Sequence, residues 1–189
     1  YFHMVKRFGD VPWYSEVISD KDWDKLQAPR TPRTVVLDSV MADINYAIDH
    51  LPEVKTVNEI SRWTALALKS RICLFEGTFR KYHTEFKLPE YEAFLDNAIA
   101  ASKELIERSG YKLYNTGHPE SDYLNLFASL NANEDEIILA RAFSDELQVY
   151  HNLNYYTMTA SYGRPGLEKR LVNSYLMRDG SRFTDIAGY

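Results

Sequence analysis

SRWTALALKSRICLFEGTFRKY, residues 61–82, has the apolar spacing of a long amphipathic helix. Ser61 belongs to the residue types that cap helix N-termini. Apolar side chains then recur every three or four positions, which places them on one face: Ala65, Leu68, Ile72, Phe75 and Phe79. Ala67 is small enough for a neighbouring helix to approach closely. The stretch therefore predicts a helix that packs against others, with Leu68 and Phe75 in the core.

A second helix is predicted before this stretch, in RTPRTVVLDSVMADINYAIDHLPE (30–53). Thr31 can cap it, Pro32 suits its first position, and the pair Leu51-Pro52 ends it. Its apolar residues also keep a spacing of three and four: Val36, Val40, Ile44, Ala47, Ile48 and Leu51. This pattern predicts one buried stripe with Ile44 at its centre.

A third helix is predicted after it, in PEYEAFLDNAIAASKELIERSG (89–110). Gly110 is placed to terminate this helix, because glycine readily adopts the left-handed conformation at a helix end. One face carries the residues expected to pack: Tyr91, Phe94, Leu95, Ala98, Ser102, Leu105 and Ile106. Leu105 is the predicted core residue of this helix.

The three helices predict a mainly α fold built from antiparallel helix pairs over about 35–51, 62–80 and 91–109. Their sizes and connecting loops match the helix pairs of tetratricopeptide-type repeats, although the strict repeat signature is absent. Such pairs form a curved scaffold with a concave face. That architecture favours a binding function over a chemical one.

The segment KRFGDVPWYSEV (6–17) follows a short aromatic helix that begins near Tyr1. Gly9 can end that helix and Pro12 cannot continue it, so Trp13 and Tyr14 fall in an extended segment. Two interpretations stay open here. The two aromatic side chains either pack back on the helix or face a ligand.

The last third of the chain has a different character. A short helix is expected in ESDYLNLFASL (120–130), and a strand or extended segment is predicted for Ile137–Ala140. DELQVYHNLNYYTMTASYGRPG (145–166) has neither a helical nor a strand period and predicts a long loop that is rich in tyrosine. LEKRLVNSYLMRDGSRF (167–183) then predicts a helix, with Asp179-Gly180 as a turn.

Composition excludes several classes of function. The 189 residues carry a net charge of −5, which argues against a nucleic-acid partner. No apolar run approaches the roughly 20 residues of a transmembrane helix. Cys73 is the single cysteine, so a disulfide and a multi-cysteine zinc site are excluded, and its place among apolar helical positions predicts a buried thiol.

Signals of catalysis are weak. The five histidines stand apart, and no nucleophile elbow, phosphate-binding loop or dinucleotide fingerprint is present. Acidic pairs such as Glu134 and Glu136 are expected in any chain with 27 acidic residues. His118, Glu120 and Asp122 could hold a metal, but a solvated helix start explains them better. We therefore assign no catalytic residue, no metal site and no cofactor.

The ordered segments resemble the SusD/RagB family of nutrient-binding lipoproteins from Bacteroidetes. The matching stretches are RFGDVPWY, PRTPRTVVLDSVMADINYAIDHLP, SRWTALALKSRICLFEGTFRKY, AIAASKELIERSGYKLY, YLNLF, NEDEIILARAF and NSYLMRDGSRF. They cover nearly the whole chain. The resemblance implies a helical, tetratricopeptide-like region over 1–133 and the start of a truncated, loop-rich ligand-binding region over 134–189.

The resemblance also implies a function. Family members sit on the outer face of the outer membrane, anchored by a lipid on an N-terminal cysteine that this chain lacks. There they cap a SusC-like TonB-dependent transporter and deliver starch or other glycans, or in some members peptides, and they are not enzymes. The alternative is a generic helical-repeat scaffold for protein partners.

Candidate ligand residues follow from the chemistry of sugar recognition. Flat aromatic faces suit C–H contacts, and polar planar groups suit hydroxyls. The tyrosine-rich loop offers both, so the predicted substrate-binding residues are Tyr155, Tyr156, Asn152, Asn154 and Tyr162, with Trp13 from the opening segment. The identity of the ligand stays open.

Overall fold

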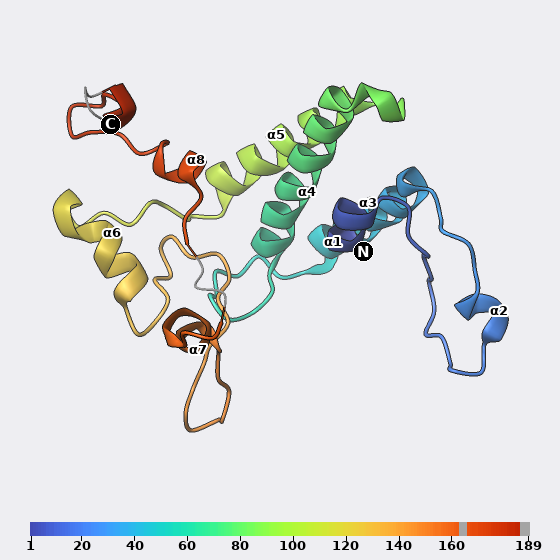
Figure 1. Ribbon diagram of the computed structural model, residues 1–189, viewed down its shortest axis with the longest axis horizontal. Coiled ribbons are helices and arrows are strands. Elements are labelled where there is room, and N and C mark those ends of the chain that lie inside the picture. The colour runs from blue at the N-terminus through green and yellow to red at the C-terminus, as the bar shows by residue number, and fades with distance from the viewer. Residues whose placement is uncertain (163–165, 186–189) are drawn as a thin grey trace. The chain divides into compact units, whose positions relative to one another are not determined.

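The computed structural model describes residues 1–162 and 166–185, and these are mainly helical (Figure 1), which confirms the predicted fold class. Over those residues the backbone forms isolated β-bridges but no strand. The α-helices are α1 (Phe2–Phe8), α2 (Trp23–Leu26), α3 (Arg33–His50), α4 (Arg62–Tyr82), α5 (Tyr91–Arg108), α6 (Pro119–Ala128), α7 (Leu153–Met158) and α8 (Lys169–Val172). Two 3₁₀ turns, η1 (Thr84–Phe86) and η2 (Phe183–Asp185), accompany them. Among the described residues, no helix has the length and apolar character needed to cross a membrane.

The chain divides into two compact units, Tyr1–Arg141 and Ala142–Tyr189, which we call the first and second unit. The first unit contains α1 to α6 and all of the long helices. The second contains α7, α8 and η2. The predicted functional division at 133/134 lies close to this structural boundary and stays a prediction.

Helix α4 is the centre of the first unit, because both α3 and α5 pack against it. The three predicted helices form within two residues of their expected limits, and Figure 1 shows α4 and α5 running in opposite directions, joined through η1. Ser61 precedes α4 as predicted, and its backbone N–H donates to Thr64 Oγ1 at 3.3 Å. At Gly77, an added Cβ would lie 2.7 Å from Leu95 Cδ2, so this glycine allows the close approach of α5.

The start of α3 differs from the prediction by one residue. The helix begins at Arg33, and Pro32 lies just before it in an extended conformation. The cap comes from a distant part of the chain, since Asp10 Oδ1 accepts the Arg33 backbone N–H at 2.8 Å. An isolated bridge between Val11 and Thr31 holds the two segments together. The turn after α1 therefore helps to fix the start of α3.

Two groups of buried side chains form the core of the first unit. The first joins α1, α3 and α4 through Phe2, Val5, Val11, Val36, Leu37 and Ile72. The second joins α3, α4 and α5 through Ile44, Ile48, Trp63, Ala65, Leu66 and Ala101. Cys73 is fully buried as predicted, and burial raises the pKa of its thiol to about 11.

The prediction of burial was wrong for two apolar residues. Leu68 is 42% exposed and Ile106 is 74% exposed. Helix α4 packs on two neighbours at once, so its buried face is wider than the stripe read from the sequence and includes Leu66 and Cys73. Leu68 lies at the edge of that face, where it lines a shallow pocket beside Ile44. Leu105 packs against the second core group as a partly buried residue.

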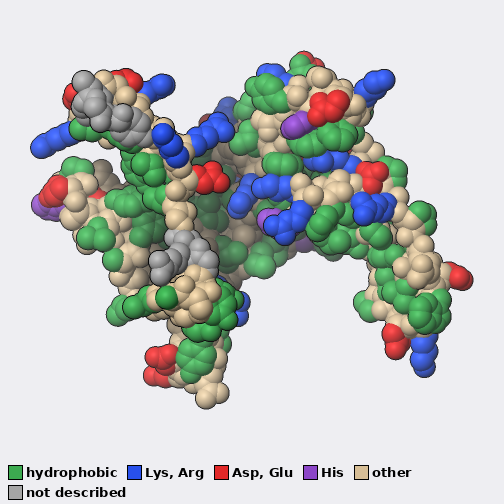
Figure 2. Space-filling model, in the orientation of Figure 1, with side chains coloured by type: hydrophobic (Ala, Val, Ile, Leu, Met, Phe, Trp, Pro, Cys, Tyr) green, Lys and Arg blue, Asp and Glu red, His purple; other side chains and the backbone are tan. Residues whose placement is uncertain are grey.

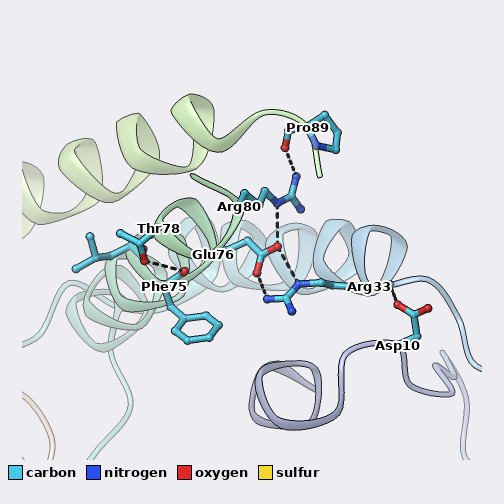
Figure 3. A network of polar contacts seen from close by, with 8 residues as sticks. Asp10, Arg33, Phe75, Glu76, Thr78, Arg80 and Pro89 are labelled. Atoms are coloured by element: carbon cyan, nitrogen blue, oxygen red, sulfur yellow. Dashed lines mark hydrogen bonds and ion pairs between the residues drawn. The ribbon is translucent and has the colours of Figure 1, made fainter. Parts of the chain in front are cut away.

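A buried ionic network lies between α3 and α4 (Figure 3). Glu76, which is fully buried, accepts from Arg33 Nη2 at 2.5 Å and from Arg33 Nε at 3.1 Å. Arg80 Nε donates to the same carboxylate at 2.8 Å, and Arg80 Nη1 donates to the Pro89 carbonyl oxygen at 2.7 Å. The network thus ties α3, α4 and the approach to α5 together with two cations and one anion.

The second unit is less regular than the sequence suggested. The predicted helix over 167–183 shortens to the four residues of α8, and a bridge between Leu176 and Arg182 closes the turn at Asp179-Gly180. The predicted long loop over 145–166 contains the helix α7, and residues 163–165 of that stretch lie outside the described residues. In the first unit, Ile137–Ala140 forms no strand: Ile137 N–H donates back to the Asn133 carbonyl oxygen at 2.9 Å, and Ala140 N–H donates to the Val57 carbonyl oxygen at 2.7 Å.

Candidate functional site

Helix α7 and the turn after it bring three predicted site residues together in the second unit. Asn152 precedes the helix, and its carbonyl oxygen accepts the Tyr156 N–H at 3.1 Å. Thr159 N–H donates to the Tyr155 carbonyl oxygen, and Tyr162 N–H donates to the Thr159 carbonyl oxygen, both at 3.1 Å. This turn folds the chain back, so that Tyr162 lies against the helix.

The rings of Tyr155, Tyr156 and Tyr162, here called the tyrosine cluster, all contact one another. Their centroids are 5.8 Å apart for Tyr155 and Tyr156, 4.8 Å for Tyr155 and Tyr162, and 5.5 Å for Tyr156 and Tyr162. The first and third pairs meet edge to face, the geometry that aromatic rings favour. The three residues remain 52%, 48% and 41% exposed. The cluster is therefore ordered by its own contacts and still open to a ligand.

Tyr162 also affects the titration of the Tyr155 hydroxyl group. A side-chain hydrogen bond with Tyr162 raises the pKa of Tyr155 above its ordinary value. A tyrosine phenol is already neutral at physiological pH, and a raised pKa does not change that. A neutral phenol can both donate and accept a hydrogen bond, which suits recognition of a sugar hydroxyl.

The two predicted asparagines flank these tyrosines along the chain. Asn152 and Asn154 are both exposed, and no hydrogen bond among the described residues uses their side-chain amides. His151 stands before them with its ring edge-on to Phe143 at 5.0 Å, and its Nδ1 accepts the Leu153 N–H at 3.3 Å. The amide groups thus remain available to a ligand, and their part in binding stays a prediction.

Trp13 belongs to the first unit, whereas the tyrosine cluster belongs to the second. Its side chain is partly buried and packs against the core group of α1, α3 and α4. Tyr14 is held by its hydroxyl, which donates to the Lys25 carbonyl oxygen at 2.5 Å. These contacts give both aromatic residues a structural role, and ligand contact by Trp13 stays a prediction.

The acidic residues near α6 also have structural partners. Asp122 accepts hydrogen bonds from the Thr116 backbone N–H at 3.0 Å and from Thr116 Oγ1 at 2.5 Å. His118 and Glu120 form an exposed pair with 3.3 Å between Nδ1 and Oε1. Over residues 1–162 and 166–185, no group of three histidine, cysteine, aspartate or glutamate side chains is arranged to hold a metal ion.

Two curated proteins are similar to this chain. SusD-like protein P2 from Formosa agariphila is 32% identical over 83 residues, which are 43% of this chain and 16% of that protein. SusD-like protein P25 from the same organism is 24% identical over 151 residues, which are 78% of this chain and 24% of that protein. The chain therefore spans about a quarter or less of the length of these relatives.

No family model matches the chain, and no solved structure matches it. Both relatives carry the name SusD-like protein, and the longer of the two matches covers 78% of this chain. These two similarities support a relationship of the chain to the SusD/RagB family.

Proposed function

We propose that this chain is part of a cell-surface protein that binds glycans for a TonB-dependent nutrient-uptake complex. The observation that carries the proposal is the tyrosine cluster, with three mutually packed rings that are each about half exposed. The relationship to SusD-like proteins supports it. In this proposal the chain binds its ligand without chemical change and needs no cofactor.

Exposed tyrosine rings are well suited to weak binding of a ligand. Tyrosine offers a large rigid contact area with a polar end, and it loses little conformational entropy when it binds. An aromatic contact is worth about 0.5–1.5 kcal/mol beyond the area it buries. A small number of such contacts on an open surface corresponds to micromolar to millimolar affinity. Weak and rapidly released binding suits a protein that hands its ligand to a transporter.

The tyrosine cluster is tested by calorimetry of the whole protein against a panel of starch and other oligosaccharides. We expect Tyr155→Ala and Tyr156→Ala each to weaken binding by about 2- to 13-fold, the factor that corresponds to one aromatic contact. Tyr155→Phe and Tyr156→Phe are the matched controls, because they keep the ring and should retain most of the affinity. Unchanged binding in both folded alanine variants would show that these rings serve packing alone.

The proposed location is the outer membrane, with the protein lipid-anchored and facing outward, and the proposed partner is a SusC-like transporter. Cys73 cannot carry the lipid, because it is buried inside α4. We expect the whole protein, solubilised from its native membrane, to co-purify with a TonB-dependent barrel protein encoded beside it. Recovery of the native protein free of any such barrel would contradict the partnership.

A second candidate function is a helical scaffold for a protein or peptide partner. The observation that favours it is an apolar groove of about 570 Å³ between α4 and α5. Leu74, Ile99 and Ile106 line this groove and are exposed. Peptide binding in the calorimetry panel, together with no response to any saccharide, would favour this function over glycan binding. Release of reducing sugar from a polysaccharide would instead indicate an enzyme.

A further inference from the structure

A second pocket, of about 680 Å³, lies in the first unit between α1, the start of α3 and η1. Four basic residues line it, Lys6, Arg7, Arg30 and Arg33, and we call it the basic pocket. Its lining contains one acidic residue, Asp10. Lysine and arginine side chains gather over this part of the surface in Figure 2, where Figure 1 draws α1 and the start of α3. The protein as a whole has a net charge of −5, so this local excess of positive charge needs an explanation.

The positive charge of the basic pocket is only partly balanced, by the carboxylate of Asp10 in its lining and by Glu76, which pairs with Arg33. Within residues 1–162 and 166–185, Lys6, Arg7 and Arg30 form no ion pair. Asp10 is already engaged by the backbone N–H of Arg33. The first turn of α3 carries no acidic side chain.

The buried network behind the pocket adds to this excess. Arg33 and Arg80 share the single carboxylate of Glu76, so the network holds one positive charge more than it holds negative charge. Arg33 also stacks on the Phe79 ring, with its guanidinium carbon 3.8 Å from the ring centroid, which keeps its cation at the pocket wall. Several like charges around one cavity repel one another, and a bound anion would relieve that repulsion.

The wall of the pocket also carries three aromatic rings, Phe8, Phe79 and Phe86. Phe8 and Phe86 are exposed there, and the Phe86 ring lies 5.5 Å from that of Phe79. Ring faces beside free guanidinium groups suit a ligand that combines an apolar C–H face with a negative charge. Arginine in particular binds planar carboxylates and tetrahedral oxyanions through paired hydrogen bonds.

We propose that the basic pocket binds the carboxylate or sulfate group of an acidic saccharide. The proposal rests on the proposed glycan-binding function and adds to it a class of ligand and a second contact site. Arg7 and Arg30 hold the anionic group, Lys6 supplies further positive charge, and Phe8 and Phe86 contact the sugar ring.

The test is calorimetry of the whole protein with three probes of equal length: an oligogalacturonate, a sulfated oligosaccharide and a neutral oligosaccharide. The test variant combines Arg7→Gln with Arg30→Gln. The matched control combines Arg71→Gln with Lys21→Gln, which removes the same charge from exposed positions of α4 and of the segment before α2 that do not line the pocket. We expect the test variant to bind at least one acidic probe about tenfold or more weakly, as when a charge-assisted hydrogen bond is lost, with neutral-probe binding unchanged. Added salt should weaken binding of that acidic probe in the unsubstituted protein.

Three results would overturn the proposal. The first is an equal loss of affinity in the test and control variants, which would indicate a general charge effect. The second is binding of anionic lipid vesicles that depends on Arg7 and Arg30 while neither acidic saccharide binds. The third is binding of the neutral probe with no preference for either acidic one, which would leave the proposed glycan-binding function standing. Binding of an acidic probe that depends on Arg7 and Arg30 but not on Tyr155 or Tyr156 would support the basic pocket and contradict the tyrosine cluster.

Discussion

Replacement of Glu76 by alanine should lower the free energy of unfolding of the first unit by about 3–5 kcal/mol. The carboxylate of Glu76 is fully buried and accepts hydrogen bonds from both Arg33 and Arg80. Without it, two buried guanidinium groups face each other with no anion between them. Taking charge out of water is costly unless it is paired, so the penalty exceeds that of losing an ordinary hydrogen bond.

Urea unfolding followed by tryptophan fluorescence measures this effect, because all three tryptophans lie in the first unit. Glu104→Ala is the matched control. Glu104 also pairs with two arginines, Arg62 and Arg108, but it is partly exposed, so its loss should cost less than about 1 kcal/mol. Glu76→Gln keeps the shape of the side chain and provides a measurable variant if Glu76→Ala does not fold. A Glu76→Gln protein as stable as the unsubstituted one would refute the proposed importance of this charge.

Replacement of Leu66 by alanine should destabilise the first unit by about 2–5 kcal/mol. Leu66 is only 2% exposed and lies in the core group shared by α3, α4 and α5. The truncation removes apolar contacts and leaves a cavity that the packed helices cannot fully close. The same urea titration measures this loss in the free energy of unfolding.

Leu68 provides the comparison on the same helix. It differs from Leu66 by two positions and is 42% exposed, so Leu68→Ala should cost less than about 1 kcal/mol. Equal losses in the two variants would mean that α4 is rotated relative to the arrangement described above. The pair therefore tests the orientation of the central helix directly.

The limits of the long helices were predictable because their signals are local. Ser61, Pro52 and Gly110 act on the backbone within a turn of their own positions, and apolar spacing identifies the face that packs. The exposure of Leu68 and Ile106 was not predictable in this way. It depends on how many neighbours a helix has and at what angle they cross, which no single stretch of sequence contains.

The ionic network and the basic pocket were missed for a related reason. Glu76 and Arg80 have the four-residue spacing of a helical ion pair, which is ordinarily an exposed feature. Their burial depends on Arg33, which is 43 residues away from Glu76 along the chain. Arg7 and Arg30 are likewise distant in sequence and meet only in the fold. The tyrosines of the second unit could be chosen as candidate ligand residues from the chemistry of their side chains. The helix α7 that brings them together was not predicted.

Cys73 gives the protein a native reporter of its own internal motion. The thiol is completely buried, donates to Met41 Sδ at 3.7 Å and is the only sulfhydryl in the sequence. Thiol reagents react with the thiolate, which a pKa of about 11 makes scarce at neutral pH, and they must first reach the sulfur. The rate at which Cys73 is modified therefore reports how often the helical core opens. No introduced probe is needed to watch α4 separate from its neighbours.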